Sequence, residues 1–106
     1  MSGTIKETPE RNIEAYLVKQ VKALGGCCPK WVSPGHNGVP DRILILPGGR
    51  IAFAETKRPK GGRASALQVV WQQILRRLGF ICEFVHTKDE ADALIYRVMM
   101  GGSDAL

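Results

Sequence analysis

Apolar residues recur at helical spacing in three segments of the chain, and each segment begins with residues that favour a helix start. The first begins at residues 8–10, where a hydroxyl, a proline and an acid suit a helix N-terminus, and it ends at Gly25 and Gly26. The second begins at the S-x-x-Q sequence of residues 65–68, and the third at the T-x-x-E sequence of residues 87–90. The expected buried stripes are Ile13, Leu17, Val21 and Leu24, then Leu67, Val70, Trp71, Ile74 and Leu78, and finally Ala91, Leu94, Ile95 and Val98.

Four shorter apolar runs predict β-strands. The run at 28–32 contains Pro29, which lacks a backbone N–H and therefore favours a sheet edge. The runs at 43–46 and 51–54 flank a Pro-Gly-Gly turn and predict a hairpin, and the last run is at 80–85. The order α-β-β-β-α-β-α predicts one α/β domain over residues 1–106, with a mixed sheet flanked by helices and frayed ends at 1–8 and 100–106.

Charged residues stand at the ends of the two hairpin strands, where apolar residues would be expected. Glu55 and Lys57 follow an apolar run and share one strand face, and Asp41 directly precedes the other run. A two-residue turn would set Asp41 opposite Thr56, whereas a three-residue turn at 47–49 sets it opposite Glu55. We predict the three-residue connection or a bulge, because a slip of one residue reverses the faces.

The composition indicates a basic protein that works in a reducing compartment. Fifteen Lys and Arg against ten Asp and Glu give a net charge of +5, which favours a polyanionic partner such as DNA. No apolar run approaches the roughly 20 residues that span a membrane, and no signal-peptide core is present, so we expect a cytoplasmic location. Three cysteines form no disulfide framework; a zinc site from Cys27, Cys28, Cys82, His36 and His86 matches no zinc spacing, so buried thiols are favoured.

Two carboxylates on neighbouring strands repel each other unless a cation lies between them. Oxygen ligands with open positions suit Mg²⁺ or Mn²⁺, which would bind between Asp41 and Glu55. Lys57, beside them, would orient or deprotonate a water molecule and offset phosphate charge. These groups suffice to hydrolyse a phosphodiester without a covalent intermediate.

The sequence Gly-Val-Pro-Asp at 38–41, followed by Glu-Thr-Lys at 55–57, resembles the signature of the PD-(D/E)xK nucleases. With Glu14 in the first helix and Gln68 in the second, residues 10–85 resemble the VRR-NUC family in particular, whose stand-alone members are phage and bacterial proteins. The resemblance implies a restriction-endonuclease-like αβββαβ core that cuts DNA with Mg²⁺ or Mn²⁺. It further implies that Asp41, Glu55 and the carbonyl of Thr56 hold the metal, that Lys57 serves the water, that Glu14 completes the acidic shell, and that Gln68 positions Lys57 or the nucleophile. Homodimers and cleavage of branched DNA, such as four-way Holliday junctions, are linked to the same family.

Each site residue also has a purely structural interpretation. Asp41 after a proline suits a turn, and Glu55 with Lys57 could be a solvated edge pair, but the three together favour catalysis. Glu14 lies about 100° round the helix from the buried stripe and could face water. Gln68 could close the capping box.

Basic residues near the predicted site are candidates for phosphate contacts. Arg58, Lys60 and Arg63 follow the catalytic strand between glycines, and Arg42, His36 and Lys30 would extend that surface. Trp31 and Trp71 are expected in the core or at a dimer contact. The sequence therefore predicts an endonuclease for branched or flapped DNA that acts as a two-fold dimer. The alternatives are a non-catalytic DNA-binding module, or a nuclease subunit that needs a partner protein.

Overall fold

A computed structural model of the chain describes residues 9–101 and contains the three helices and three of the four strands that the sequence predicts. The predicted cap at Thr8 and the tail beyond Gly101 lie outside the described residues. Met100 and Gly101, placed by the sequence in a frayed tail, are hydrogen-bonded to the last turn of the third helix. The elements are α1 Glu10–Ala23, β1 Arg42–Leu46, β2 Arg50–Thr56, α2 Ala66–Arg77, β3 Ile81–Val85 and α3 Lys88–Met99.

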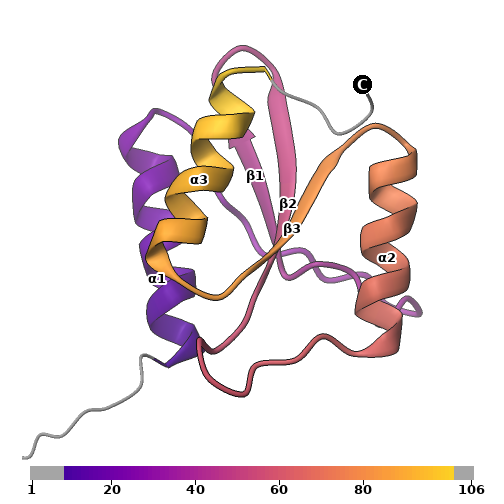
Figure 1. The fold of residues 1–106 in the computed structure, drawn as a ribbon. Helices are drawn as coiled ribbons and strands as arrows, with labels where there is room; N and C mark the ends of the chain where they lie inside the picture. Colours follow the sequence, from indigo (N-terminus) through magenta and orange to yellow (C-terminus); the bar gives the residue numbers. More distant parts are fainter. Residues whose placement is uncertain (1–8, 102–106) are drawn as a thin grey trace, which may run out of the picture.

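The three strands form one mixed sheet in the order β1-β2-β3. β1 and β2 are antiparallel, and β2 and β3 are parallel, so α2 serves as the crossover connection that a parallel pair requires. Figure 1 shows α1 and α3 on one side of the sheet and α2 on the other. The predicted α/β architecture, a mixed sheet flanked by helices, is confirmed.

The segment at 28–32 is not a continuous strand, and that part of the prediction is wrong. It runs antiparallel to β1 but forms only two isolated bridges, Cys27 with Ile45 and Lys30 with Arg42. Pro29 has no N–H to donate, although its carbonyl accepts a bond from the backbone of Ile43. The segment therefore lies along the edge of β1 without extending the ladder.

The hairpin has the three-residue connection that the sequence predicts. Leu46 pairs with Arg50 across residues 47–49, and the same register pairs Arg42 with Ala54. One step further along this register, Asp41 lies opposite Glu55. The turn length therefore brings the two acids to the same end of the sheet.

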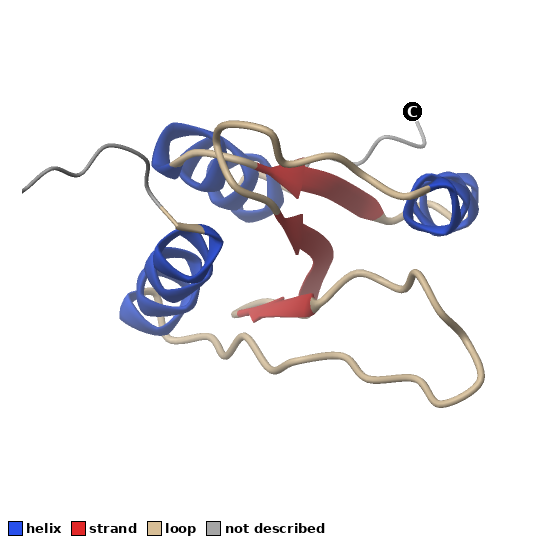
Figure 2. Ribbon diagram, turned by 90° about the horizontal axis from the view of Figure 1, so that it is seen from below, coloured by secondary structure: helices blue, strands red, loops and turns tan. Residues whose placement is uncertain are grey.

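The two faces of the sheet have separate apolar cores. Figure 2 shows the helices on both sides of the sheet. On one face, Leu44 and Ala54 of the hairpin pack with the predicted stripes of α1 and α3, including Leu17 and Leu94. On the other face, a smaller cluster forms from Phe53, Leu75 and Cys82, with Trp31, Ile43 and Trp71 packed against it. The expectation that both tryptophans belong to the core or to a dimer contact fits their place in this second cluster.

The buried stripe predicted for α2 is largely wrong. Within α2 only Leu75 is buried, while Leu67, Val70 and Leu78 (the helix cap) are 51%, 45% and 69% exposed. A three-stranded sheet is narrow, and α2 packs mainly against β3 at its edge, so one side of the helix has no partner in the chain. Leu24, the last residue of the stripe predicted for α1, is also exposed at the helix cap.

The predicted helix caps are observed in full at α2 and in half at α3. Ser65 and Gln68 exchange both bonds of a capping box. At α3, Thr87 accepts a bond from the backbone of Glu90, but the Glu90 carboxylate accepts from the backbone N–H of His86 instead of returning to Thr87. The loop before α3 is therefore fixed one residue earlier than the sequence predicts.

Candidate active site

Two acids meet where β1 begins and β2 ends. Asp41 directly precedes β1, and Glu55 is the next-to-last residue of β2, on the face that α2 covers. Glu55 is only 6% exposed and Thr56 is fully buried. Two neighbouring carboxylates at a buried strand end, where an apolar core would be the ordinary solution, form the centre of the candidate site.

Thr56 holds the carboxylate of Asp41 with two hydrogen bonds. Its hydroxyl donates to Oδ2 over 2.9 Å, and its backbone N–H donates to Oδ1 over 3.3 Å. The strand that carries Glu55 therefore also fixes Asp41. The sequence assigned only the carbonyl of Thr56 to the site, and the role of its side chain was missed because a threonine in a strand has no specific signal.

Lys57 lies beside Glu55, as the spacing of two along the strand predicts. Its Nζ is 3.6 Å from Oε2 of Glu55, and both side chains are largely buried. The backbone N–H of Lys57 donates to the carbonyl of Val85 over 2.8 Å, which keeps the residue in the sheet just past β2. The sheet thus fixes the backbone of Lys57, and the amine lies beside Glu55.

Gln68 closes the capping box and at the same time contacts Glu55, whereas the sequence analysis expected it to position Lys57 or the nucleophile. Its Oε1 accepts from the backbone N–H of Ser65 over 2.9 Å, which closes the capping box. Its Nε2 donates to Oε2 of Glu55 over 2.9 Å. The first turn of α2 is therefore joined directly to the site.

Glu14 lies near the site, but its carboxylate faces Arg42. Nε of Arg42 donates to Oε2 of Glu14 over 2.8 Å, and each side chain is 17% exposed. Nη1 of Arg42 also donates to the carbonyl of Cys28. Arg42, assigned to a DNA-binding surface from the sequence, is thus half-buried and engaged within the protein. Charge at a strand start could not reveal this partner, which is 28 residues away along the chain.

The acids are destabilised in their charged form. The pKa of Asp41 is raised to about 6, chiefly by burial. The negative charges of Glu14 and Glu10 contribute to this rise, and the hydrogen bonds from Thr56 oppose it. Burial also raises the pKa of Glu55 to about 7, with Asp41 and Glu10 adding to the shift and Lys57 opposing it. Glu10, one helical turn before Glu14, is a neighbour of the site that the sequence analysis did not select.

The donor set suits a hard divalent cation. Asp41 and Glu55 offer carboxylate oxygens, and burial raises the pKa of both acids, so a bound cation would favour their charged forms. Over residues 9–101, no three His, Cys, Asp or Glu side chains lie close enough together to hold a metal ion. This agrees with the pairing of the Glu14 carboxylate with Arg42. The charge of Glu14 therefore raises the pKa of Asp41, while its carboxylate pairs with Arg42.

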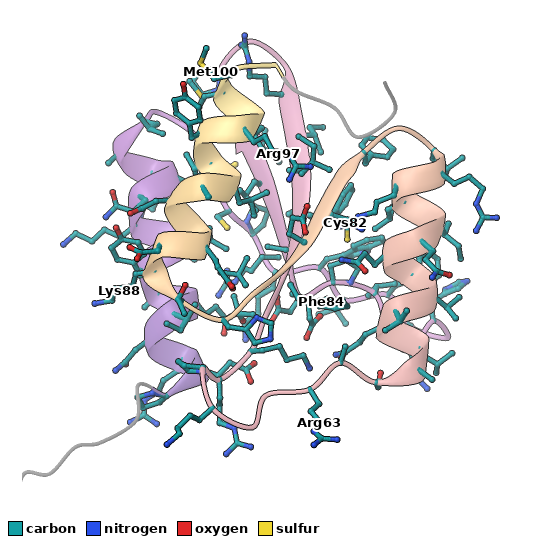
Figure 3. The ribbon with its side chains drawn as sticks, in the orientation of Figure 1. Arg63, Cys82, Phe84, Lys88, Arg97 and Met100 are labelled. Atoms are coloured by element: carbon teal, nitrogen blue, oxygen red, sulfur yellow. The ribbon has the colours of Figure 1, made fainter. Side chains whose placement is uncertain are left out.

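The predicted phosphate-binding residues divide into two groups. Arg58, Lys60 and Arg63 are exposed in the loop from β2 to α2, and Figure 3 shows Arg63 projecting from this loop. Lys30 and His36 are exposed on the segment that precedes β1. The ring of His36 makes an edge contact with Trp71, with 5.8 Å between ring centroids, so this segment packs against α2.

The cysteines follow the expectation of buried thiols at two of three positions. Cys28 and Cys82 are buried, and Cys27 is exposed. Burial raises the pKa of the Cys28 thiol to about 11, which keeps it protonated and unreactive. Cys82 lies in the cluster between β3 and α2 (Figure 3).

Comparison with known proteins shows which proteins this chain resembles. No family model matches the sequence. A solved structure described as "VRR_NUC domain" has the same fold, with a TM-score of 0.77 and 28% identity, over 84% of this chain and 97% of that one. The chain resembles the VRR-NUC family in sequence and in fold. The resemblance of residues 10–85 to VRR-NUC proteins is therefore confirmed by the fold.

One curated relative of this chain comes from a phage. It is named "Putative nuclease p44", from Acyrthosiphon pisum secondary endosymbiont phage 1, and it is 52% identical over 50 residues. The match spans 47% of this chain and 54% of the relative, so it covers about half of each protein. Within residues 9–101, no helix is both long and apolar enough to cross a membrane.

Proposed function

We propose that this protein, which resembles the VRR-NUC family, is a metal-dependent DNA endonuclease. The observation that carries the proposal is the register that sets Asp41 opposite Glu55, with the amine of Lys57 only 3.6 Å from the second acid. A protein that only bound DNA would gain nothing from two buried acids near phosphates. The nuclease-named phage relative and the VRR_NUC structure support the same activity.

Mg²⁺ or Mn²⁺ is the cofactor that these residues fit. Asp41, Glu55 and the carbonyl of Thr56 would hold the ion, and Glu14 would contribute through its charge or through water. When bound, such an ion polarises a phosphodiester, lowers the pKa of a water molecule and stabilises the leaving oxygen. Its positive charge would also favour the charged forms of Asp41 and Glu55, whose pKa values are raised chiefly by burial.

Side chains of this protein would activate the water, orient the Glu55 carboxylate and bind the DNA backbone. Lys57 orients or deprotonates the water that attacks phosphorus, and its charge offsets that of the phosphate. Gln68 fixes the Glu55 carboxylate through the bond from Nε2, so that the second oxygen of the acid stays directed to the site. Arg58, Lys60 and Arg63 bind neighbouring phosphates and read the shape of the DNA backbone, with little base specificity.

Branched DNA and a two-fold dimer complete the proposal. A four-way junction has two equivalent strands to cut, and a dimer with C₂ symmetry presents two matched sites. The apolar residues that α2 leaves exposed are compatible with a contact between two copies. Light scattering of the purified protein, with and without a junction, measures the number of copies.

The function is tested on a four-way junction and a linear duplex of the same sequence, with every strand end blocked against exonucleases. Each substrate is incubated with Mg²⁺, Mn²⁺ or EDTA. The proposal expects internal cuts in the junction with either metal and none with EDTA. Equal cutting of junction and duplex would retain the nuclease but remove the selectivity for branches, and binding without cutting under both metals would refute the catalytic proposal.

A further inference from the structure

Gly38 lies against the backbone of α2 so closely that no side chain fits. A Cβ added there would lie 2.7 Å from both the carbonyl carbon and the Cβ of Leu67, and 2.8 Å from its oxygen. Its φ of +93° is also one that glycine adopts without strain. The segment before β1 and the first turn of α2 therefore touch at this residue.

The two segments that touch carry different parts of the site. Gly38 is three residues before Asp41, which Thr56 holds at the start of β1. Leu67 directly precedes Gln68, which donates to Glu55. The same loop also contacts α2 one turn later, through the rings of His36 and Trp71. The contact at Gly38 therefore sets the spacing between the segment that leads to Asp41 and the helical turn that carries Gln68.

We propose that Gly38 is a positioning residue: its missing side chain keeps the first turn of α2 close enough for Gln68 to hold Glu55. The geometric part of this inference concerns the bond between Gln68 and Glu55 alone. Its catalytic part rests on the proposed nuclease function.

The size of the expected displacement follows from the contacts. Ordinary contacts of a Cβ begin at about 3.4 Å, so a methyl group at Gly38 must separate the two segments by about 0.7 Å at several atoms together. The atoms that it meets belong to backbone and Cβ, and they cannot rotate away as the end of a long side chain would. A shift of that size lengthens the 2.9 Å bond from Gln68 beyond good hydrogen-bond geometry.

The same loop contains a matched control for the test. Gly35 also has positive φ, +83°, but a Cβ there would meet nothing within 4 Å. Gly35→Ala and Gly38→Ala thus add similar backbone strain, and only the second adds the contact with α2. If Gly38→Ala does not fold, Gly38→Asn is compared with Gly35→Asn, because asparagine tolerates positive φ better and still carries a Cβ.

The first measurement is independent of catalysis. In ¹H–¹⁵N spectra of the metal-free protein, the side-chain amide of Gln68, assigned by its absence in Gln68→Glu, reports the bond to Glu55. The proposal expects this resonance to move in the Gly38 variant and to stay in place in the Gly35 variant. An unmoved Gln68 resonance in a folded Gly38 variant, or an equal shift in both variants, would overturn the inference.

The second measurement uses cleavage of the junction. Displacement of catalytic groups by about 1 Å costs up to about 100-fold in rate, so kcat of the Gly38 variant should fall by about tenfold or more, with KM little changed. The Gly35 variant should stay within about threefold of wild type. A wild-type protein that cuts no DNA would refute the proposed function, and the amide resonance would still decide whether Gly38 positions Gln68. Equal loss of kcat in both variants would show that the contact of Gly38 with α2 has no specific role in positioning.

Discussion

Nε2 of Gln68 donates a 2.9 Å hydrogen bond to Oε2 of Glu55, and the oxygen of the same amide accepts from the backbone of Ser65. The Gln68 side chain thus closes the capping box of α2 and also fixes the buried carboxylate of Glu55. Because the amide uses its oxygen for the cap and its nitrogen for the acid, the two tasks depend on opposite ends of the group. They can therefore be separated by substitution.

Gln68→Glu should keep the fold and lose the activity. A glutamate at this position still accepts from Ser65, as the usual acid of a capping box does, but it cannot donate to Glu55 and adds a second negative charge there. We expect a change in unfolding free energy of about 1 kcal/mol or less at pH 5 and a loss of cleavage of about 100-fold or more at pH 7.5. Urea unfolding and single-turnover cleavage measure the two effects.

Ser65→Ala is the matched control, since it removes the hydroxyl that caps Gln68 but leaves the backbone N–H that binds Oε1. It should lower the unfolding free energy by about 1 kcal/mol and change cleavage by less than about threefold. If both variants lost cleavage in proportion to their stability, the bond from Gln68 to Glu55 would have no catalytic role.

The raised pKa of Glu55 predicts how stability depends on pH. Between its ordinary pKa of 4.5 and the folded value of about 7, the folded state holds a proton that the unfolded state releases. The contribution of this group is therefore full below about pH 4.5 and is lost as the pH rises through about 7. Glu55→Gln cannot charge, so at pH 8 it should exceed wild type by on the order of 1–3 kcal/mol in unfolding free energy. Urea unfolding of both proteins from pH 4.5 to 8 measures the difference, and curves that stay parallel would show that Glu55 is not destabilised by its surroundings.

A divalent cation should stabilise the wild-type protein at pH 7.5. Binding to the folded state alone raises the unfolding free energy by about 2.7 kcal/mol when the ion is at 100 times its Kd. Asp41→Asn and Glu55→Gln each remove one proposed carboxylate ligand and should lose most of this gain. Thermal unfolding with Mg²⁺ or Mn²⁺, against Na⁺ of matched ionic strength, gives the comparison. Equal stabilisation of all three proteins would place the ion elsewhere.

The basic loop and Arg42 should differ in their effect on DNA binding. Replacing Arg58, Lys60 and Arg63 together by alanine should lower the slope of log K against log salt by about 2.7, if each contacts one phosphate. Arg42→Ala should leave the slope unchanged, because Arg42 already binds Glu14 and the carbonyl of Cys28. Fluorescence anisotropy with a labelled duplex in EDTA, at several salt concentrations, separates the two cases.

A control with the same change in charge is provided by Lys19, Lys22 and Arg77, which are exposed on α1 and at the end of α2. The triple alanine variant of these residues should reduce the slope by clearly less than the loop variant. Equal slopes for the two triples would mean that net charge, and not the position of the loop, governs binding.

Local patterns were sufficient to predict the centre of the site. The three residues of the hairpin turn determine the register, and the register brings Asp41 to Glu55. The spacing of two places Lys57 beside Glu55, and the S-x-x-Q sequence marks the start of α2. These relationships depend on the geometry of one strand pair or one helical turn, and such geometry can be read from neighbouring residues.

The features that the sequence did not reveal depend on contacts between distant segments. Arg42 looks like a surface cation until α1 brings Glu14 beside it. The apolar spacing of α2 predicts a buried face, but it cannot show that the sheet is too narrow to cover Leu67 and Val70. The sequence places Gly38 at the start of the Gly-Val-Pro-Asp motif, but only the folded chain places it against Leu67.

The central claim is that Asp41, Glu55 and Lys57 form a hydrolytic site, and Lys57→Ala tests it most directly. Lys19→Ala, which removes the same charge from an exposed position on α1, is the control. Single-turnover cleavage of the end-blocked four-way junction is measured in Mg²⁺ for wild type and both variants, with binding measured in EDTA. We predict that Lys57→Ala binds within about threefold of wild type but cuts at least about 100-fold more slowly, while Lys19→Ala cuts normally. A Lys57→Ala protein that cuts as fast as wild type would contradict the account.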